Sequence, residues 1–180
     1  MIYLLYGKVP NLRKGAGFMN LILTFSRRYC TGASVIAEEL SKRYNLPIYG
    51  KDYICRQLHN EVDLEKQNEV IRELAKSSCI IMGRGASEAL KDNKNVVNIY
   101  VYADKADRIK RAMAKENISE QEAIQRIKDV DAERINYYEE NTGKFWGDMD
   151  NYDVIIDSSK YGIENCADII CRYLETHDYI

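Results

Sequence analysis

The residues best suited to chemistry lie in one turn of the sequence. Residues 26–34 read Ser-Arg-Arg-Tyr-Cys-Thr-Gly-Ala-Ser, and they connect the apolar run 21–25 to an amphipathic stretch that begins at Gly32. A helix that starts directly after a buried strand offers unpaired backbone N–H groups and the positive end of its dipole, which suits a phosphate group. The turn is therefore a candidate anion site.

The turn matches part of a known phosphate-binding pattern. In G-x-x-x-x-G-K-[ST], the glycines allow a nest of backbone donors, the Lys reaches the β- and γ-phosphates, and the hydroxyl binds Mg²⁺. Here Arg27 stands at the first Gly position, Gly32 at the second, Ala33 at the Lys position and Ser34 at the hydroxyl position. On this pattern alone, a plain strand–helix connection is favoured, in which Gly32 relieves backbone strain and Ser34 caps the helix.

Short β-rich runs alternate with longer amphipathic stretches along the rest of the chain. This alternation is typical of a parallel sheet covered by helices, so the sequence predicts an α/β fold. Ser119-Glu-Gln-Glu122 is a capping-box start for one of the helices. The predicted strands are 21–25, 79–82, 96–102 and 152–157, and the predicted helices are 32–44, 64–77, 105–116, 119 to about 138, and 163–174.

Composition limits the class of protein. A chain of 180 residues fits one domain, and a formal net charge of −2 gives no basic field for a nucleic-acid partner. The five cysteines are scattered and the two histidines lack metal-ligand spacing, which favours a reduced cytoplasmic protein without structural zinc. No apolar run approaches the roughly 20 residues that span a bilayer, so we expect no membrane partner. The composition leaves a monomer or a homodimer open.

The first 18 residues differ from the rest of the chain. Residues 7–18 have the composition of a linker and directly precede Met19. Two interpretations are about equally favoured: an N-terminal arm, or a spurious extension upstream of translation that starts at Met19. In either case we expect residues 19–180 to form the single folded domain.

Several segments together resemble the cytidylate kinase-like family of the P-loop nucleoside monophosphate kinase superfamily. Residues 26–33 resemble the family's Ser-Arg-x-x-Gly-Ser-Gly-Gly loop, and the resemblance runs from Met19 to Leu174. The other segments that carry it are Asn45-Leu-Pro-Ile-Tyr-Gly-Lys-Asp52, Cys79-Ile-Ile-Met-Gly-Arg-Gly85, Asp131-Ala-Glu-Arg134 with Tyr137-Tyr138 and Thr142-Gly143, Trp146-Gly147-Asp148, and Asn151-Tyr152-Asp153.

The resemblance implies a three-layer P-loop kinase core with a parallel sheet of about five strands, flanked by helices and closed by a helical lid. It also implies an ATP-dependent phosphotransferase that uses Mg²⁺ and passes the γ-phosphoryl group to a nucleoside monophosphate such as CMP or dCMP. Nucleotide substrates are then the expected partners. The residues implied for ATP are Ser26, Arg27, Arg28, Thr31, Gly32, Ala33 and Ser34, with Ser34 also the Mg²⁺ ligand.

The same resemblance implies the catalytic residues. Arg84 would bind the acceptor phosphate, and Arg126 and Arg134, with Asp131 beside them, would close over the transferred group as part of the lid. Each has a structural alternative. Asp131 and Arg134 have the spacing of a surface ion pair on one helix, Arg84 could cap the sheet end, and Trp146 could serve the core or a stacking platform.

Departures from the family pattern keep a second function open. Cys30 replaces a Gly of the family loop and would be strained at positive φ, and Gly85 stands where cytidylate kinases carry an Asp. Residues 53–63 are also shorter than the family's acceptor segment. The alternatives are therefore a catalytically weak or inactive nucleotide-binding protein, and a kinase for another small phosphate acceptor.

Overall fold

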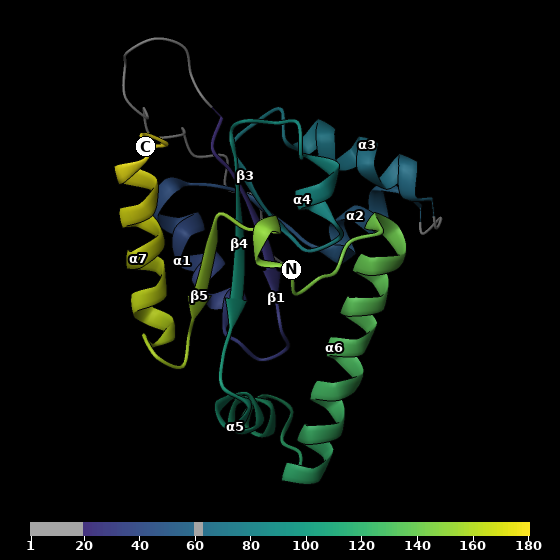
Figure 1. The fold of residues 1–180 in the computed structure, drawn as a ribbon, viewed down its shortest axis with the longest axis vertical. Helices are drawn as coiled ribbons and strands as arrows, with labels where there is room; N and C mark the ends of the chain where they lie inside the picture. Colours follow the sequence, from purple (N-terminus) through teal and green to yellow (C-terminus); the bar gives the residue numbers. More distant parts are fainter. Residues whose placement is uncertain (1–19, 60–62) are drawn as a thin grey trace.

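A five-stranded parallel sheet forms the centre of the molecule (Figure 1). The computed structural model describes residues 20–59 and 63–180. The sheet order is β2-β3-β1-β4-β5, which confirms the expected parallel sheet of about five strands. The strands are β1 (Ile22–Arg27), β2 (Ile48–Tyr49), β3 (Cys79–Met82), β4 (Val96–Tyr102) and β5 (Val154–Asp157).

Helices connect the strands. The bounds of β3, β4 and α5 agree with the sequence prediction, whereas β2, α2 and α4 were not predicted. The described helices are α1 (Ala33–Tyr44), α2 (Lys51–Gln57), α3 (Leu64–Leu74), α4 (Ala86–Ala89), α5 (Lys105–Glu116), α6 (Glu120–Thr142) and α7 (Ile163–Thr176), with a 3₁₀ turn at Met149–Asn151.

The sheet is buried on both faces. Leu23 and Phe25 of β1 pack with α1 and α7 on one face, and Ile22, which precedes Leu23, packs with α2, α3 and α4 on the other. This alternation follows from the period of two along a strand. It gives the three expected layers, with α1 and α7 on one side of the sheet and α2 to α4 on the other (Figure 1).

The longest helix, α6, starts at the predicted capping box. The Ser119 hydroxyl accepts from the Glu122 N–H, and the Glu122 carboxylate accepts from the Ser119 N–H. The helix continues past the predicted end to Thr142, where Gly143 ends it in the left-handed conformation with φ +67°. α6 packs against α5, which follows the carboxyl end of β4 (Figure 1).

Two further expectations concern the first residues of the chain and membrane-spanning helices. The two interpretations of residues 1–18 lie outside the described residues and stay predictions. No described helix has the length and apolar character needed to cross a membrane.

Candidate active site

The turn after β1 is shaped by two residues with positive φ. Cys30 has φ +58° and Gly32 has φ +81°, so the strain expected at Cys30 is present in the structure. At Gly32 a Cβ atom would also meet Ile163 Cδ1 at 2.4 Å, because α7 passes close to the turn. Gly32 is the N-cap residue of α1, and within residues 20–59 and 63–180 no side chain, Ser34 included, forms a capping hydrogen bond at this end of the helix.

The backbone of the turn presents free donors. Among the described residues, the N–H groups of residues 30–34 have no hydrogen-bond acceptor, whereas the Arg28 N–H is bound to the Val101 carbonyl at 3.3 Å. Successive N–H groups in a turn with mixed φ signs form a nest that binds anions. The helix dipole of α1 adds positive potential at the same place. The turn therefore has the geometry of a phosphate site although only part of the sequence pattern is present.

Residues distant in sequence hold the turn in this shape. The Tyr29 N–H donates to Asp131 Oδ1 at 2.7 Å, and Arg108 Nε donates to the Tyr29 carbonyl at 2.7 Å. Arg108 also forms a buried ion pair with Asp131. Side chains of α5 and α6 therefore bind both the N–H and the carbonyl of Tyr29, and we call this arrangement the clamp. The Ser158 hydroxyl donates to the Thr31 carbonyl at 2.6 Å.

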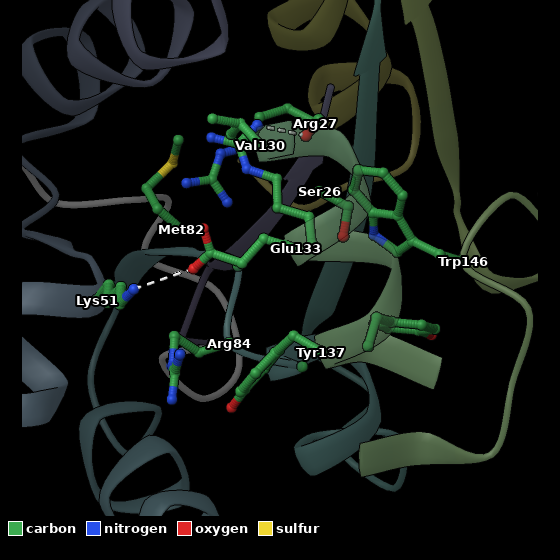
Figure 2. Close-up of a pocket in the computed structure, with 13 residues that line it drawn as sticks. Ser26, Arg27, Lys51, Met82, Arg84, Val130, Glu133, Tyr137 and Trp146 are labelled. Atoms are coloured by element: carbon green, nitrogen blue, oxygen red, sulfur yellow. Dashed lines mark hydrogen bonds and ion pairs between the residues drawn. The ribbon is translucent and has the colours of Figure 1, made fainter. Parts of the chain in front are cut away.

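A cavity of about 230 Å³ adjoins the turn (Figure 2). It lies between the carboxyl ends of β1 and β3 and the helix α6, and ligands of open parallel sheets collect at this edge. Its lining residues are Ser26, Arg27, Lys51, Met82, Gly83, Arg84, Gly85, Val130, Glu133, Arg134, Tyr137, Tyr138 and Trp146.

Three arginines line this cavity. Arg27, Arg84 and Arg134 form no ion pair with any carboxylate in residues 20–59 and 63–180. Burial, and then the nearby charge of Arg134, lower the pKa of Arg27 to about 10. Burial also lowers the pKa of Arg134. Because burial penalises these charges, an anion bound between them would be strongly favoured.

Arg27 joins the turn to the cavity. It is the last residue of β1, and a Cβ atom at Gly83 would lie 2.4 Å from Arg27 Nη1, so the absence of a side chain at Gly83 makes room for the guanidinium. Arg134 Nη1 donates to the Arg27 carbonyl at 2.9 Å, which fixes α6 over the end of β1. Figure 2 shows Arg27 at one end of the cavity and Arg84 at the other.

The other predicted site residues with side chains do not line the cavity. Arg28 and Ser34 are exposed at the surface of the turn, and Thr31 is buried with its hydroxyl bound to the Arg28 carbonyl at 3.1 Å. Arg126 does not line the cavity and pairs with Glu116 at 3.3 Å. Asp131 pairs with Arg108 rather than with Arg134, so the i,i+3 ion pair considered from the sequence is absent among the described residues.

An aromatic group forms one wall of the cavity. Trp146 is 5% exposed, its ring lies 5.5 Å from that of Tyr100, and Tyr152 donates its hydroxyl to the Trp146 carbonyl at 2.9 Å. Trp146 is thus a core residue that also lines the cavity, and its use as a stacking platform stays a prediction.

Sequence reasoning missed Lys51, Glu133, Gln67 and Tyr137. The first two form an ion pair of 3.2 Å between α2 and α6 (Figure 2). Gln67 is 2% exposed and contacts Arg84. The signal for it was present, because Gln67 lies three, four and seven residues before the inward apolar positions 70, 71 and 74. A polar residue on the buried face of a helix needs hydrogen-bond partners.

Comparisons with known proteins identify the family of the chain. The sequence model of the cytidylate kinase-like family matches residues 60–160, more than half of the chain. A cytidylate kinase of Methanocaldococcus jannaschii is 24% identical over 86% of this chain and 98% of its own length. A cytidylate kinase of Methanococcus vannielii is 29% identical over 83% of this chain and 97% of its own length.

Solved structures show the same fold. An uncharacterised protein from Eubacterium ventriosum has a TM-score of 0.83 and 30% identity, over 87% of this chain and 99% of the other. A shikimate kinase from Bacteroides thetaiotaomicron, at 14% identity, has a TM-score of 0.56 over 86% of this chain and 98% of its own, and this likeness concerns the fold alone. The chain belongs to the cytidylate kinase-like family, and family and fold together support a nucleotide kinase-like function.

Proposed function

We propose that this protein transfers the γ-phosphoryl group of ATP to a nucleoside monophosphate, with CMP and dCMP as the first candidates. One observation carries the proposal: free backbone donors at the start of α1 adjoin a cavity with three arginines that have no carboxylate partner among the described residues. Phosphoryl transfer is mostly positioning and neutralisation of charge, so such a site needs no nucleophilic side chain of its own.

The turn is the proposed donor side. The N–H groups of residues 30–34 would hold the phosphates of ATP, and the Ser34 hydroxyl is exposed where Mg²⁺ would accompany them. Among the described residues no group of three or more His, Cys, Asp or Glu side chains could hold a metal. That suits Mg²⁺, which keeps several waters and binds through substrate phosphates. When bound, Mg²⁺ supplies charge neutralisation between the β- and γ-phosphates.

The cavity is the proposed acceptor side. Arg84 at the far end would bind the acceptor phosphate, while Arg27 and Arg134 lie near the turn, where charge develops during transfer. Arg27 takes the place of the Lys that the usual pattern carries at position 33, because Ala33 is buried and uncharged. We assign Asp131 to holding the turn, and Arg126 remains a candidate lid cation that would have to leave Glu116.

A second function has specific support. Only the seven residues of α2 form a helix between β2 and the undescribed residues 60–62, and Cys30 holds a strained conformation in the turn. A protein with this site could bind a nucleotide and transfer its phosphate slowly or not at all, since acceptor positioning contributes to rate as well as affinity.

A coupled ADP-release assay tests both functions. Turnover of ATP with Mg²⁺ is measured without acceptor and with CMP, dCMP, UMP and AMP. The rates are compared with the turnover numbers of kinases, which are about 1–100 s⁻¹. CMP- or dCMP-dependent ADP release supports the proposal. Nucleotide binding in a thermal-shift panel without acceptor-dependent turnover supports the second function. No binding of any nucleoside phosphate at millimolar concentration overturns both.

A further inference from the structure

A buried carboxamide holds the arginine at the far end of the cavity. Gln67 of α3 is 2% exposed, and its Oε1 accepts from Arg84 Nε at 2.8 Å and from Arg84 Nη2 at 2.5 Å. Its Nε2 donates to the backbone carbonyl of the same residue, Arg84, at 3.1 Å. One side chain therefore fixes both the backbone and the guanidinium of Arg84.

Helix α6 completes the arrangement. The Tyr137 hydroxyl of α6 donates to Gln67 Oε1 at 2.8 Å, and the Arg84 guanidinium lies 4.1 Å from the centre of the Tyr137 ring. Figure 2 shows Arg84 and Tyr137 side by side at the same end of the cavity. Three donors thus meet on one amide oxygen, and the arginine is fixed from two helices.

The backbone at Arg84 explains why it needs support. Gly83, Arg84 and Gly85 have φ of +77°, +61° and +67°, so Arg84 lies in a run of three left-handed residues. This conformation is costly for a residue with a side chain, and such strain clusters at ligand-binding positions. The bond from Gln67 Nε2 to the Arg84 carbonyl opposes the relaxation of this turn.

The choice of an amide over a carboxylate has an electrostatic consequence. The guanidinium has five N–H donors, and the two bonds to Gln67 leave three without an acceptor among the described residues. A carboxylate at this place would orient the group equally well but would neutralise it, as Asp131 does for the buried Arg108 of the turn. An amide orients Arg84 and leaves its positive charge for an anion.

We infer that Gln67 is a positioning residue that, with Tyr137, presents the charged Arg84 to the phosphate of the acceptor. The inference rests on the proposed function for the identity of the acceptor. It predicts that the neutral charge of residue 67 matters as much as its shape. A purely structural role predicts that a carboxylate at position 67 impairs anion binding less than an apolar side chain does. A carboxylate would keep two of the three contacts to Arg84, whereas an apolar side chain would keep none.

The test uses Gln67→Glu, which preserves shape and adds a charge, and Gln67→Met, which removes the hydrogen bonds. Tyr137→Phe is a milder variant that keeps the ring on Arg84, and thermal melts confirm that each variant folds. Gln57→Glu is the matched control, since Gln57 is exposed at the end of α2 and receives the same change of charge. The readouts are the KM values for CMP and ATP, and calorimetric titration with CMP and with inorganic phosphate.

We expect Gln67→Glu to raise the KM and Kd for CMP, and the Kd for phosphate, by about 10- to 100-fold, the range for a lost hydrogen bond to a charged group. Its KM for ATP should stay within about twofold of that of the unmodified protein, because the substitution leaves the donor turn untouched. Gln57→Glu should behave as the unmodified protein. Unchanged anion affinity in Gln67→Glu, or equal rises in both KM values, would overturn the inference.

The two proposals fail in different ways. If no acceptor supports ADP release, the transferase proposal fails, but the phosphate titration still decides the role of Gln67. If the unmodified protein binds neither CMP nor phosphate, the inference on Gln67 is overturned as well. If turnover is normal in Gln67→Glu, the inference fails while the transferase proposal stands.

Discussion

Arg27 stands where the usual phosphate-binding pattern has a glycine, and its side chain lies in the cavity rather than in solvent. The neighbouring Arg28 has the same charge but is exposed. The two residues therefore offer a comparison in which charge is equal and only position differs. It separates a specific role of the buried guanidinium from a general attraction of anions to a basic turn.

We predict that Arg27→Ala lowers ATP-dependent turnover by roughly a hundredfold or more, the effect of removing a donor that stabilises developing charge. Arg28→Ala should change it by less than about threefold, since a solvated charge contributes little. The measurement is kcat/KM for ATP in the ADP-release assay. Equal effects of the two substitutions would show that the position of Arg27 is not special.

Gly32 allows a second prediction at the residue scale. Gly32→Ala should destabilise the fold by about 1–3 kcal/mol, because the residue has φ +81° and the new Cβ would meet Ile163 Cδ1 at 2.4 Å. In an Ile163→Ala background the clash is absent and only the cost of the backbone conformation, about 1–2 kcal/mol, should remain. Urea denaturation of the unmodified protein, the two single variants and the double variant gives the coupling energy between residues 32 and 163. A zero coupling energy would mean that Ile163 moves aside without cost.

At the scale of elements, α5 and α6 support the turn from outside the sheet. Arg108 and Asp131 enclose both backbone groups of Tyr29, and Arg108 is 3% exposed. Because Arg108 is buried, water cannot solvate its guanidinium in place of Asp131. Removal of Asp131 therefore leaves an uncompensated buried charge.

Asp131→Ala should therefore destabilise the protein by about 3–5 kcal/mol, as measured by denaturant unfolding. Asp129→Ala on the same helix is the control, because Asp129 is exposed and bonded to Gln125 alone among the described residues. It should change stability by less than about 0.5 kcal/mol. A similar small effect at both positions would contradict the proposed clamp of the turn.

The elements show what the sequence could and could not predict. Strands β3 and β4 were predicted to the residue because buried parallel strands are continuous apolar runs between turn signals. Helices α2 and α4 have seven and four residues, too few for an apolar period to be visible. The clamp could not be predicted either, because Tyr29 and Asp131 lie 102 residues apart and no local spacing relates them.

At the scale of the whole molecule, the site depends on two packed layers and on the helix α6. One hydrophobic cluster joins β1 to α1 and α7, another joins it to α2, α3 and α4, and the cavity opens where α6 crosses the end of the sheet. Burial, and then the nearby charge of Arg134, lower the pKa of Arg27, so the cavity disfavours this positive charge while no anion is bound. A bound polyanion should then stabilise the entire fold.

We predict that a nucleotide at 100 times its Kd raises the free energy of unfolding by about 2.7 kcal/mol. At a fixed nucleotide concentration the stabilisation should fall as salt rises, since screening weakens the attraction of exposed donors for phosphate and so raises the Kd. Thermal melts with ATP, with and without Mg²⁺, and at two salt concentrations measure it. A melting temperature that does not respond to any nucleotide would contradict the assignment of the turn.

The wall of the cavity has an optical consequence. The sequence contains one tryptophan, and Trp146 lies in the cavity lining, packed against Tyr100. All intrinsic indole fluorescence of the protein therefore comes from a single point beside the proposed acceptor. Its intensity and emission maximum respond to the polarity and contacts around the ring, so a rapid-mixing experiment can follow the filling of the cavity without an added label.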